Sequence, residues 1–91
     1  MLDVILSNRF RKDLKLAQKR GYDLSLLEKV VDMLSRCEEL PARNRDHSLT
    51  GEYAGFRECH ILPDWLLVYR IEESALILFL SRTGTHSDLF D

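Results

Sequence analysis

The spacing of apolar residues near the start of the chain changes at Ser7, from one that favours a strand to one that favours a helix. The run from Asp3 to Leu6 is short, apolar and rich in β-branched residues, which favours a strand, and Ser7 behind it is a good helix N-cap. Three apolar residues then recur at helical spacing: Phe10, Leu14 and Ala17. Gly21 can supply the left-handed residue that commonly ends a helix. The pattern therefore predicts a strand followed by a helix that ends near Gly21.

A second helix is predicted from Leu24 to about Cys37, with Asp23 as its N-cap. Its apolar residues form two stripes. The first stripe consists of Leu24, Leu27, Val31 and Leu34, and the second of Leu26, Val30 and Met33. Because the helix is apolar on two sides, we expect it to be more buried than the first.

Strand patterns follow Gly51. Before it, Pro41 ends the helical region, and the segment 40–53, LPARNRDHSLTGEY, has turn residues and no apolar period, which indicates an irregular loop. Three runs rich in aromatic and β-branched residues then predict strands at roughly 53–62, 65–71 and 75–81. The Leu62-Pro63-Asp64-Trp65 sequence favours a tight turn, and 72–74 is a short polar link, so we expect an antiparallel meander. The tail after Gly84 can add a turn of helix.

The predicted fold class is α+β. A short N-terminal strand precedes two helices that pack on one face of a small antiparallel sheet, in the order β-α-α-β-β-β. The chain has 91 residues and a mass of 10.7 kDa, so we expect residues 1–91 to form a single domain. With 45% hydrophobic and 31% charged residues, the composition is that of an ordinary globular protein.

The sequence indicates a cytoplasmic protein. It has no apolar run of the roughly 18 to 20 residues that span a bilayer, and its start is neither a signal peptide nor an anchor, so no membrane partner is expected. Cys37 and Cys59 lack a CxxC spacing and are too few for a disulfide scaffold, which fits a reducing compartment. We interpret both cysteines as buried packing residues.

Basic residues are concentrated in the first helix, although the net charge of the chain is −2. The segment from Arg9 to Arg20 has one acidic residue, Asp13, and six basic ones: Arg9, Arg11, Lys12, Lys15, Lys19 and Arg20. Because the apolar stripe faces inward, these basic side chains should point outward. Such a run is most often a solvated helix face, and contact with a polyanion is the alternative.

Polar residues of the second half can converge at one end of the sheet. His60 ends the first meander strand, Asp64 follows it across the Pro turn, and the last strand runs back so that Arg82 can reach the same region. His47 in the loop and His86 in the tail are the other histidines. Each has a structural alternative: packing for a lone histidine, an Asx turn for Asp64, and for Arg82 an ion pair with Glu58 or Asp88.

Metal binding and nucleophilic catalysis fit these residues poorly. The three histidines and Asp64 lack metal-ligand spacing, so no metal or other cofactor is expected. Cys59 and His60 are adjacent on a strand and point to opposite faces, which prevents direct pairing. Metal-free RNA cleavage fits better, because the ribose 2′-hydroxyl is the nucleophile and the protein supplies only a base, an acid and cationic groups.

Three segments carry a family resemblance that covers nearly all of the chain: KDLKLAQKRG, DHSLTGEYAGFRECHILPDWLLVYRI and RTGTHSDLF. Together the motifs DH-x-L-x-G, H-x-x-PDW and RTGTH-x-x-LF resemble the YafQ-type toxins of the RelE superfamily, which are ribosome-dependent endoribonucleases of bacterial toxin-antitoxin operons. Glu58 and Cys59 stand where members of that family vary.

The resemblance implies roles for individual residues. Its catalytic positions correspond to His47, His60, Asp64 and His86, and its supporting or RNA-binding positions to Arg82 and Phe90. We favour His60 and His86 as the proton-transfer pair. The exposed basic residues of the first helix become candidates for ribosomal RNA contact: Arg11, Lys12, Lys15 and Lys19. Phe90 becomes a candidate for stacking on an mRNA base.

The resemblance also implies partners: a cognate antitoxin protein, the ribosome with its mRNA, and a higher-order toxin-antitoxin complex. The alternative function is that of a non-catalytic ParE-like toxin, which binds and inhibits DNA gyrase. Such a protein has no need of three histidines and an aspartate at one end of its sheet. A stand-alone nucleic-acid-binding module is disfavoured by the acidic second half of the chain.

Overall fold

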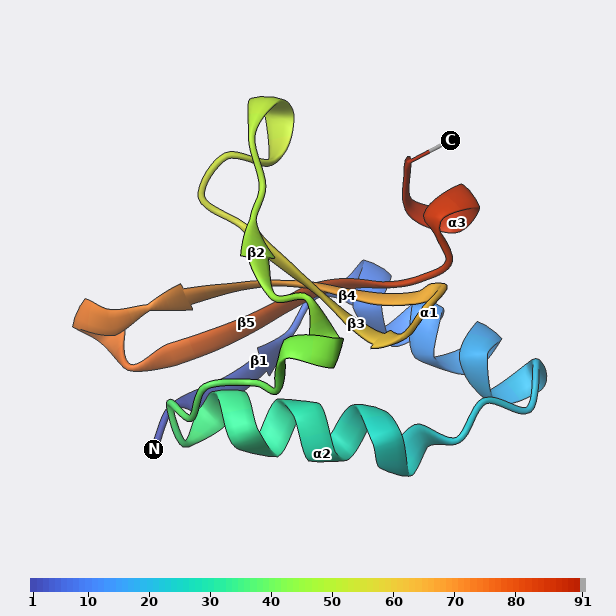
Figure 1. Ribbon diagram of the computed structural model, residues 1–91, viewed down its shortest axis with the longest axis horizontal. Coiled ribbons are helices and arrows are strands. Elements are labelled where there is room, and N and C mark those ends of the chain that lie inside the picture. Colours follow the sequence, from blue (N-terminus) through green and yellow to red (C-terminus); the bar gives the residue numbers. More distant parts are fainter. Residues whose placement is uncertain (91) are drawn as a thin grey trace.

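The helices lie where the sequence predicts them. The computed structural model describes residues 1–90, whose first elements are β1 (Asp3–Leu6), α1 (Asn8–Lys19) and α2 (Leu24–Ser35) (Figure 1). The side-chain oxygen of Ser7 accepts a hydrogen bond from the backbone N–H of Phe10, and Asp23 accepts one from Ser25. These caps satisfy donors that a helix leaves unpaired in its first turn, which is why both helices begin there.

The rest of the chain differs from the prediction in detail. Its elements are η1 (Ala42–Asn44), β2 (His47–Ser48), η2 (Gly51–Tyr53), β3 (Arg57–Leu62), β4 (Trp65–Glu72), η3 (Glu73–Ala75), β5 (Ile77–Gly84) and α3 (His86–Phe90), η being a 3₁₀ helix. The loop predicted to be irregular thus holds a short strand and two 3₁₀ helices. The last strand begins later than predicted because η3 and the left-handed Leu76, with φ of 55°, form the preceding turn.

The five strands form one mixed sheet, in the order β1-β5-β4-β3-β2. β2 to β5 pair antiparallel, as the predicted meander requires, whereas β1 pairs parallel with β5. The sheet is therefore not purely antiparallel. A parallel pair needs a long crossover connection, and the whole segment between β1 and β5 supplies it here.

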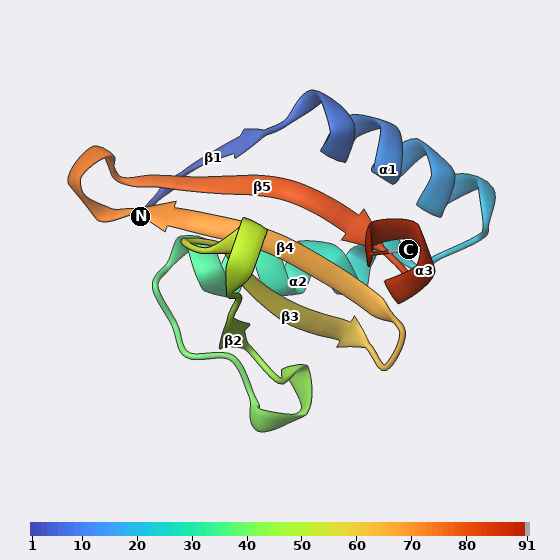
Figure 2. The same ribbon diagram turned by 90° about the horizontal axis from the view of Figure 1, so that it is seen from above.

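Both α1 and α2 cover the same face of the sheet, as predicted (Figures 1 and 2). The core under that face joins helix residues such as Phe10, Leu27 and Leu34 to strand residues such as Trp65 and Tyr69. We call this the helix face. Leu26 and Met33, from the second stripe of α2, pack only partly against this core. Within residues 1–90, no helix is long and apolar enough to cross a membrane.

The two cysteines have different environments. Cys59 lies on the helix face with no exposed surface, and burial raises the pKa of its thiol to about 12. Cys37 is exposed and has a left-handed φ of 59° just after α2, so our interpretation of it as a buried packing residue was wrong. A helix C-terminus places such a residue on the surface.

The opposite face of the sheet is only partly covered. Alternate residues of β3 and β4 point to it, among them Glu58, His60 and Leu66. The short helix α3, confirming the helical turn expected in the tail, packs Leu89 against Leu66 and Val68. Figure 2 shows α3 over the end of this face, which we call the open face.

Candidate active site

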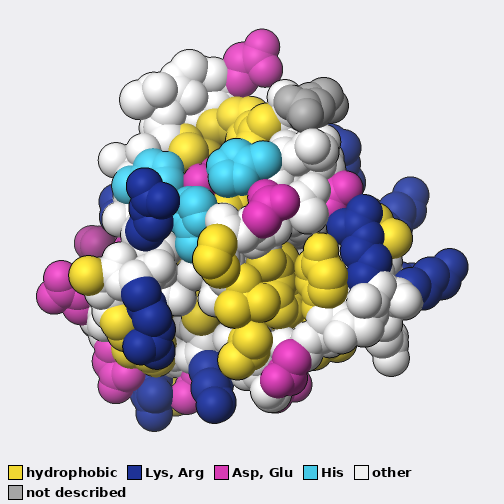
Figure 3. Space-filling model, turned by 45° about the vertical axis from the view of Figure 1, so that its right-hand side comes forward, with side chains coloured by type: hydrophobic (Ala, Val, Ile, Leu, Met, Phe, Trp, Pro, Cys, Tyr) yellow, Lys and Arg dark blue, Asp and Glu magenta, His cyan; other side chains and the backbone are white. Residues whose placement is uncertain are grey.

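The three histidines come together on the open face. The ring centroids of His47 and His60 are 6.5 Å apart, and those of His60 and His86 are 5.9 Å apart. Figure 3 shows the three side chains gathered on one part of the surface. His47 comes from β2, His60 from β3 and His86 from α3. The order of strands predicts that His60 and Asp64 lie at one end of the sheet, and in the structure His86, which contacts Asp64, and His47 lie beside His60.

Strand register explains how two of the histidines share a face with an acidic residue. His47 pairs with Glu58 across β2 and β3, and directly opposed residues of an antiparallel pair lie on the same side. His60 follows Glu58 by two positions, so it too lies on that side. Three titratable side chains thus occupy adjacent positions of the open face.

Glu58 is a functional candidate that sequence reasoning missed. Its Oε1 lies 3.6 Å from His47 Nε2 and 3.7 Å from His60 Nε2, and its side chain is only 7% exposed. Its carboxylate therefore faces the Nε2 atoms of both strand histidines. The signal was present in the sequence as the two-residue spacing of Glu58 and His60, which places both on one face of a strand.

Backbone carbonyls fix the orientation of both strand histidines. His60 Nδ1 lies 3.1 Å from the carbonyl oxygen of Pro63, and His47 Nδ1 lies 2.7 Å from that of Arg45. A carbonyl oxygen only accepts hydrogen bonds, so each Nδ1 carries the proton and donates it. Nε2 of each ring, the nitrogen that faces Glu58, is therefore the one that can exchange a proton.

His86 is held by Asp64, across the turn between β3 and β4. One carboxylate oxygen of Asp64 accepts hydrogen bonds from both the backbone N–H and Nδ1 of His86, each at 3.1 Å. These bonds, first the backbone one, lower the pKa of Asp64 below its ordinary value of 3.8. Asp64 is thus ionised at neutral pH and directs Nε2 of His86 away from itself. This contact goes beyond the Asx turn that was the structural alternative.

The helix that carries His86 is anchored by polar contacts. Thr85 and Asp88 exchange hydrogen bonds in a capping-box arrangement, at 2.9 and 3.1 Å. Arg20, at the end of α1, binds Asp88 with both terminal nitrogens, at 2.6 and 3.1 Å. The Arg20 guanidinium and the Thr85 backbone N–H hold the pKa of Asp88 well below its usual range. A Cβ on Gly84 would come within 2.9 Å of Asp88, so glycine permits this close fold.

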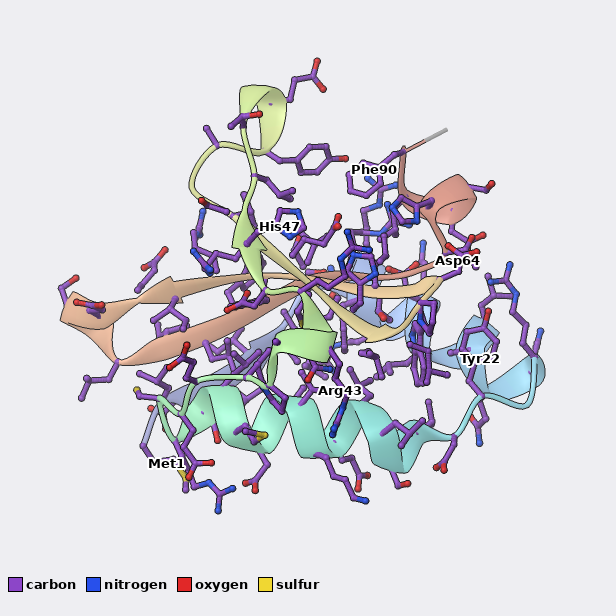
Figure 4. The ribbon with its side chains drawn as sticks, in the orientation of Figure 1. Met1, Tyr22, Arg43, His47, Asp64 and Phe90 are labelled. Carbon is purple, nitrogen blue, oxygen red and sulfur yellow. The ribbon has the colours of Figure 1, made fainter. Side chains whose placement is uncertain are left out.

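Phe90 borders the cluster at the end of α3. Its ring packs edge-on against Tyr53 with centroids 5.4 Å apart, and it lies 6.3 Å from the His86 ring. The side chain nevertheless stays exposed. Figure 4 shows Phe90 and His47 on opposite sides of the histidine cluster, above the sheet. Phe90 therefore presents aromatic surface beside the histidines.

Arg82 has a different partner from the two weighed in the sequence. Its Nε lies 2.7 Å from Asp13 Oδ2 and its Nη2 3.2 Å from Oδ1, so Asp13 of α1 binds it through two oxygens. Within residues 1–90, neither Glu58 nor Asp88 forms an ion pair with it. Asp13 raises the pKa of the guanidinium, which is 14% exposed. Arg82 is therefore a fixed cation of β5 whose Nε and Nη2 are already engaged.

The basic residues of α1 are separate from this cluster. All of them are exposed on α1, as predicted: Arg11, Lys12, Lys15 and Lys19. The helix contacts β5 and lies along the edge of the sheet where β1 ends, and His47 lies above the sheet (Figures 2 and 4). The basic residues therefore stand on a different element from the histidines, although Arg20 at the end of α1 reaches Asp88 of α3.

Two buried polar contacts hold the loop that carries His47. Asn44 is buried and donates from Nδ2 to the carbonyl oxygen of His60, at 2.8 Å. Asp46 accepts hydrogen bonds from the Tyr69 hydroxyl and from Arg57 Nε. The loop is thereby fixed to β3 and β4 on both sides of Arg45.

The arrangement suits proton transfer. The three imidazoles are neighbours, and each has Nδ1 engaged, so that Nε2 is left to act on a substrate. Among residues 1–90, no group of three or more His, Cys, Asp or Glu side chains is placed to hold a metal ion. The chemistry of the residues themselves is that of a general acid and a general base.

Comparisons with known proteins agree with this geometry. A family model described as "Bacterial toxin of type II toxin-antitoxin system, YafQ" matches residues 2–91. A curated relative is the mRNA interferase toxin YafQ of Escherichia coli strain K12. It is 40% identical over 89 residues, which cover 97% of this chain and 95% of that protein.

Solved structures match over almost the whole chain. A metal-bound toxin from Helicobacter pylori superposes with a TM-score of 0.94 at 49% identity, covering 99% of this chain and 100% of that one. The Escherichia coli DinJ-YafQ toxin-antitoxin complex contains a chain that superposes with a TM-score of 0.89 at 40% identity, covering 99% and 98%.

Proposed function

Because this chain belongs to the YafQ family of bacterial type II toxins, we propose that its histidine cluster cleaves mRNA by acid-base catalysis. The chain is an endoribonuclease, an mRNA interferase toxin of a type II toxin-antitoxin system. The ParE-like alternative finds no support among its relatives. One observation carries the catalytic proposal: three imidazoles on the open face each have Nε2 available while Nδ1 is held.

The proposed reaction needs no nucleophile from the protein. One histidine of the pair His60 and His86 takes the proton of the ribose 2′-hydroxyl, whose oxygen attacks the adjacent phosphorus. The other donates a proton to the departing 5′-oxygen as the P–O bond breaks. The products are a 2′,3′-cyclic phosphate and a 5′-hydroxyl. One ring gains a proton and the other loses one, so the total number of protons on the pair does not change.

The neighbouring residues tune this pair. Glu58 places a nearly buried carboxylate beside Nε2 of His47 and of His60. Asp64 orients His86 through its Nδ1 proton. Arg82 adds positive charge for the phosphate, and the exposed ring of Phe90 offers a stacking surface for an unpaired base.

We propose that no divalent metal takes part at the toxin itself. The Helicobacter pylori relative was solved as a metal-bound toxin, but the residues that the structure describes here include no suitable ligand group. Ribosomes need Mg²⁺, so metal analysis of the purified toxin is a better test than chelation. Stoichiometric metal that disappears when His47, His60 or His86 is replaced would contradict the metal-free mechanism.

Ribosome dependence is the second part of the proposal. The exposed basic face of α1 has the charge to contact ribosomal RNA phosphates. Neutralising Lys15 and Lys19 together should weaken ribosome association and reduce its salt dependence, by roughly one unit of slope for each phosphate that is no longer neutralised. A saturating ribosome concentration should restore the cleavage rate, because neither lysine stands on an element that carries a histidine. If the variant binds ribosomes as tightly as wild type across a salt series, the basic face of α1 is a solvated helix face with no part in ribosome binding.

The cellular context follows from the family. A cognate antitoxin is a partner of the chain, as DinJ is of the Escherichia coli protein. We place the protein in the cytoplasm, where mRNA and ribosomes are found, and expect a higher-order toxin-antitoxin complex. The cleavage proposal is tested by mapping the ends of one mRNA incubated with the toxin, with and without translating ribosomes. A substrate with a 2′-deoxy sugar at the cut position should resist cleavage, and its cleavage would exclude the 2′-hydroxyl mechanism.

A further inference from the structure

A groove of about 540 Å³ lies between α2 and the segment η1 that precedes β2. Its size is within the range of roughly 300 to 1,000 Å³ for small-molecule pockets, which is enough for a nucleotide. Basic and apolar side chains line it: Lys29, Arg43, Arg45, Leu26, Met33 and Leu62. Figure 4 shows Arg43 extending from η1 toward α2.

The groove is continuous with the histidine cluster. His60 lines it as well, and the Pro63 carbonyl that orients His60 belongs to another lining residue. Figure 3 shows Lys and Arg side chains beside the histidines, along the border of an apolar patch. A strand of RNA whose cut phosphate lies at His60 must leave the cluster in some direction, and this groove begins at that residue.

We propose that this groove binds the nucleotide next to the cut phosphate of single-stranded mRNA, an inference that rests on the proposed function. Lys29, Arg43 and Arg45 bind the following phosphate, and the apolar floor accepts the sugar and base. We call this the flanking-nucleotide groove.

Charge supports an RNA occupant. The lining includes three cations, and none of the lining residues that the structure describes is acidic, although the whole chain has a net charge of −2. Without a polyanionic partner, three cations in one groove only repel each other. A cluster of cations in a chain whose net charge is negative therefore favours a phosphate as the ligand of the groove.

The loop that carries two of these cations is held in place. Asn44, between Arg43 and Arg45, is buried and bonded to the His60 backbone. The carbonyl of Arg45, a residue with the left-handed φ of 48°, accepts the hydrogen bond from His47. The same segment thus sets the position of a histidine and of the cations, which keeps the phosphate-binding groups in register with the catalytic ones.

The apolar floor explains the second stripe of α2. All three of its residues line the groove: Val30 is also part of the core, whereas Leu26 and Met33 are only partly buried. Adaptable side chains such as methionine suit a surface that accepts different bases.

An acidic amphipathic segment of an antitoxin is the competing occupant of the groove. Measuring the affinities for RNA and for the antitoxin on the same variants separates the two.

The experiment compares two charge-matched double variants. Arg43→Ala with Arg45→Ala removes two groove cations, and Arg36→Ala with Arg70→Ala removes two cations that lie outside both the groove and α1. Single-turnover cleavage is measured on ribosomes carrying one mRNA, over a series of toxin and salt concentrations. Binding of a 20-nucleotide RNA with a 2′-deoxy sugar at the cut position is measured in parallel, and so is affinity for the antitoxin.

We expect the groove variant to need roughly tenfold more toxin for half-maximal cleavage, with the maximal rate within about twofold of wild type. Its salt slope for RNA binding should fall by about 0.7 for each phosphate of the single strand that the variant no longer neutralises. The control variant should change neither. A 4-thiouridine next to the cut position should crosslink to the groove segment in wild type.

Three outcomes would overturn the proposal. The groove variant and the control variant could weaken RNA binding equally, which would mean that the loss comes from the change in net charge and not from the groove. Antitoxin affinity alone could fall, which would assign the groove to a protein segment. The 4-thiouridine could crosslink only outside the groove. If wild type itself fails to cut, the proposed function fails, while RNA binding and crosslinking still test the groove.

Discussion

The two halves of the active site are built differently. His47 and His60 stand on paired strands, and backbone carbonyls hold their Nδ1 protons. His86 stands on a five-residue helix and is held by the carboxylate of Asp64. The side chain of His60 is 11% exposed and that of His86 is 59% exposed.

This difference has a physical consequence. His47 and His60 have their backbones in paired strands and their Nδ1 atoms held by main-chain carbonyls of the adjoining loop and turn, so the strand half is preorganised. The helix half depends on the Asp64 contact and the Arg20–Asp88 ion pair, both at the surface, where water and salt compete. We therefore expect the strand half to resist changes of condition and the helix half to respond to them.

The largest effect should come from the proton-transfer pair. His60→Ala and His86→Ala should each lower the single-turnover cleavage rate by roughly 10² to 10⁴-fold, the usual contribution of a general acid or base. The pair should differ in stability: His86→Ala should leave the melting temperature unchanged, whereas His60→Ala opens a space beside the core and should lower it. Cleavage at the wild-type rate by either variant would remove that residue from the mechanism.

Glu58→Gln should have the next largest effect, because it removes the charge that faces both strand histidines while keeping the shape. We expect a rate roughly 10 to 100-fold lower, as for other groups that orient catalytic ligands. The loss should fall on the maximal single-turnover rate and not on the toxin concentration that gives half-maximal cleavage, because Glu58 is nearly buried and faces the histidines. Glu52→Gln, an exposed change in η2, is the matched control. A maximal rate equal to that of wild type would remove Glu58 from the mechanism.

Arg20→Ala tests the helix half and should have a smaller effect. Loss of the ion pair with Asp88 should reduce cleavage several-fold at low salt, and wild type should approach the variant as salt rises. Because the pKa of Asp88 is depressed in the folded state, its contribution is present above the ordinary value of 3.8 and is lost as pH falls further. Arg36→Ala breaks surface ion pairs elsewhere and should not alter cleavage. Identical salt profiles for wild type and Arg20→Ala would mean that this ion pair does not position His86.

Tyr69→Phe should have the smallest effect on cleavage. It removes the hydroxyl that donates to Asp46, next to His47, and should lower the free energy of unfolding by about 1 kcal/mol. Cleavage should change no more than about threefold, since the carbonyl of Arg45 still orients His47 and Asn44 still holds the loop. Denaturant unfolding and single-turnover rates measure both. A fall of tenfold or more in rate would show that the strand half is less rigid than its backbone contacts indicate.

Much of the fold could be predicted because its signals are local. Ser7 and Asp23 mark helix starts through their own hydrogen bonds, and the apolar stripe of α1 identifies its buried face. The short strand β2 could not be found, because two residues have no detectable period and their pairing depends on β3. The parallel pairing of β1 was equally invisible, since its partner β5 lies at the other end of the chain.

The candidate site shows the same division. Residue types and motifs in the sequence determined which side chains can move protons, and strand alternation alone would have placed Glu58 beside His60. Tertiary structure decided their contacts: it paired Arg82 with Asp13, aimed Asp64 at His86, and set Arg43 and Arg45 beside a groove that ends at His60. Local sequence encodes period, caps and chemistry, because these depend on neighbours along the chain. Contacts between residues 22 or 69 positions apart form only when the sheet and helices have packed.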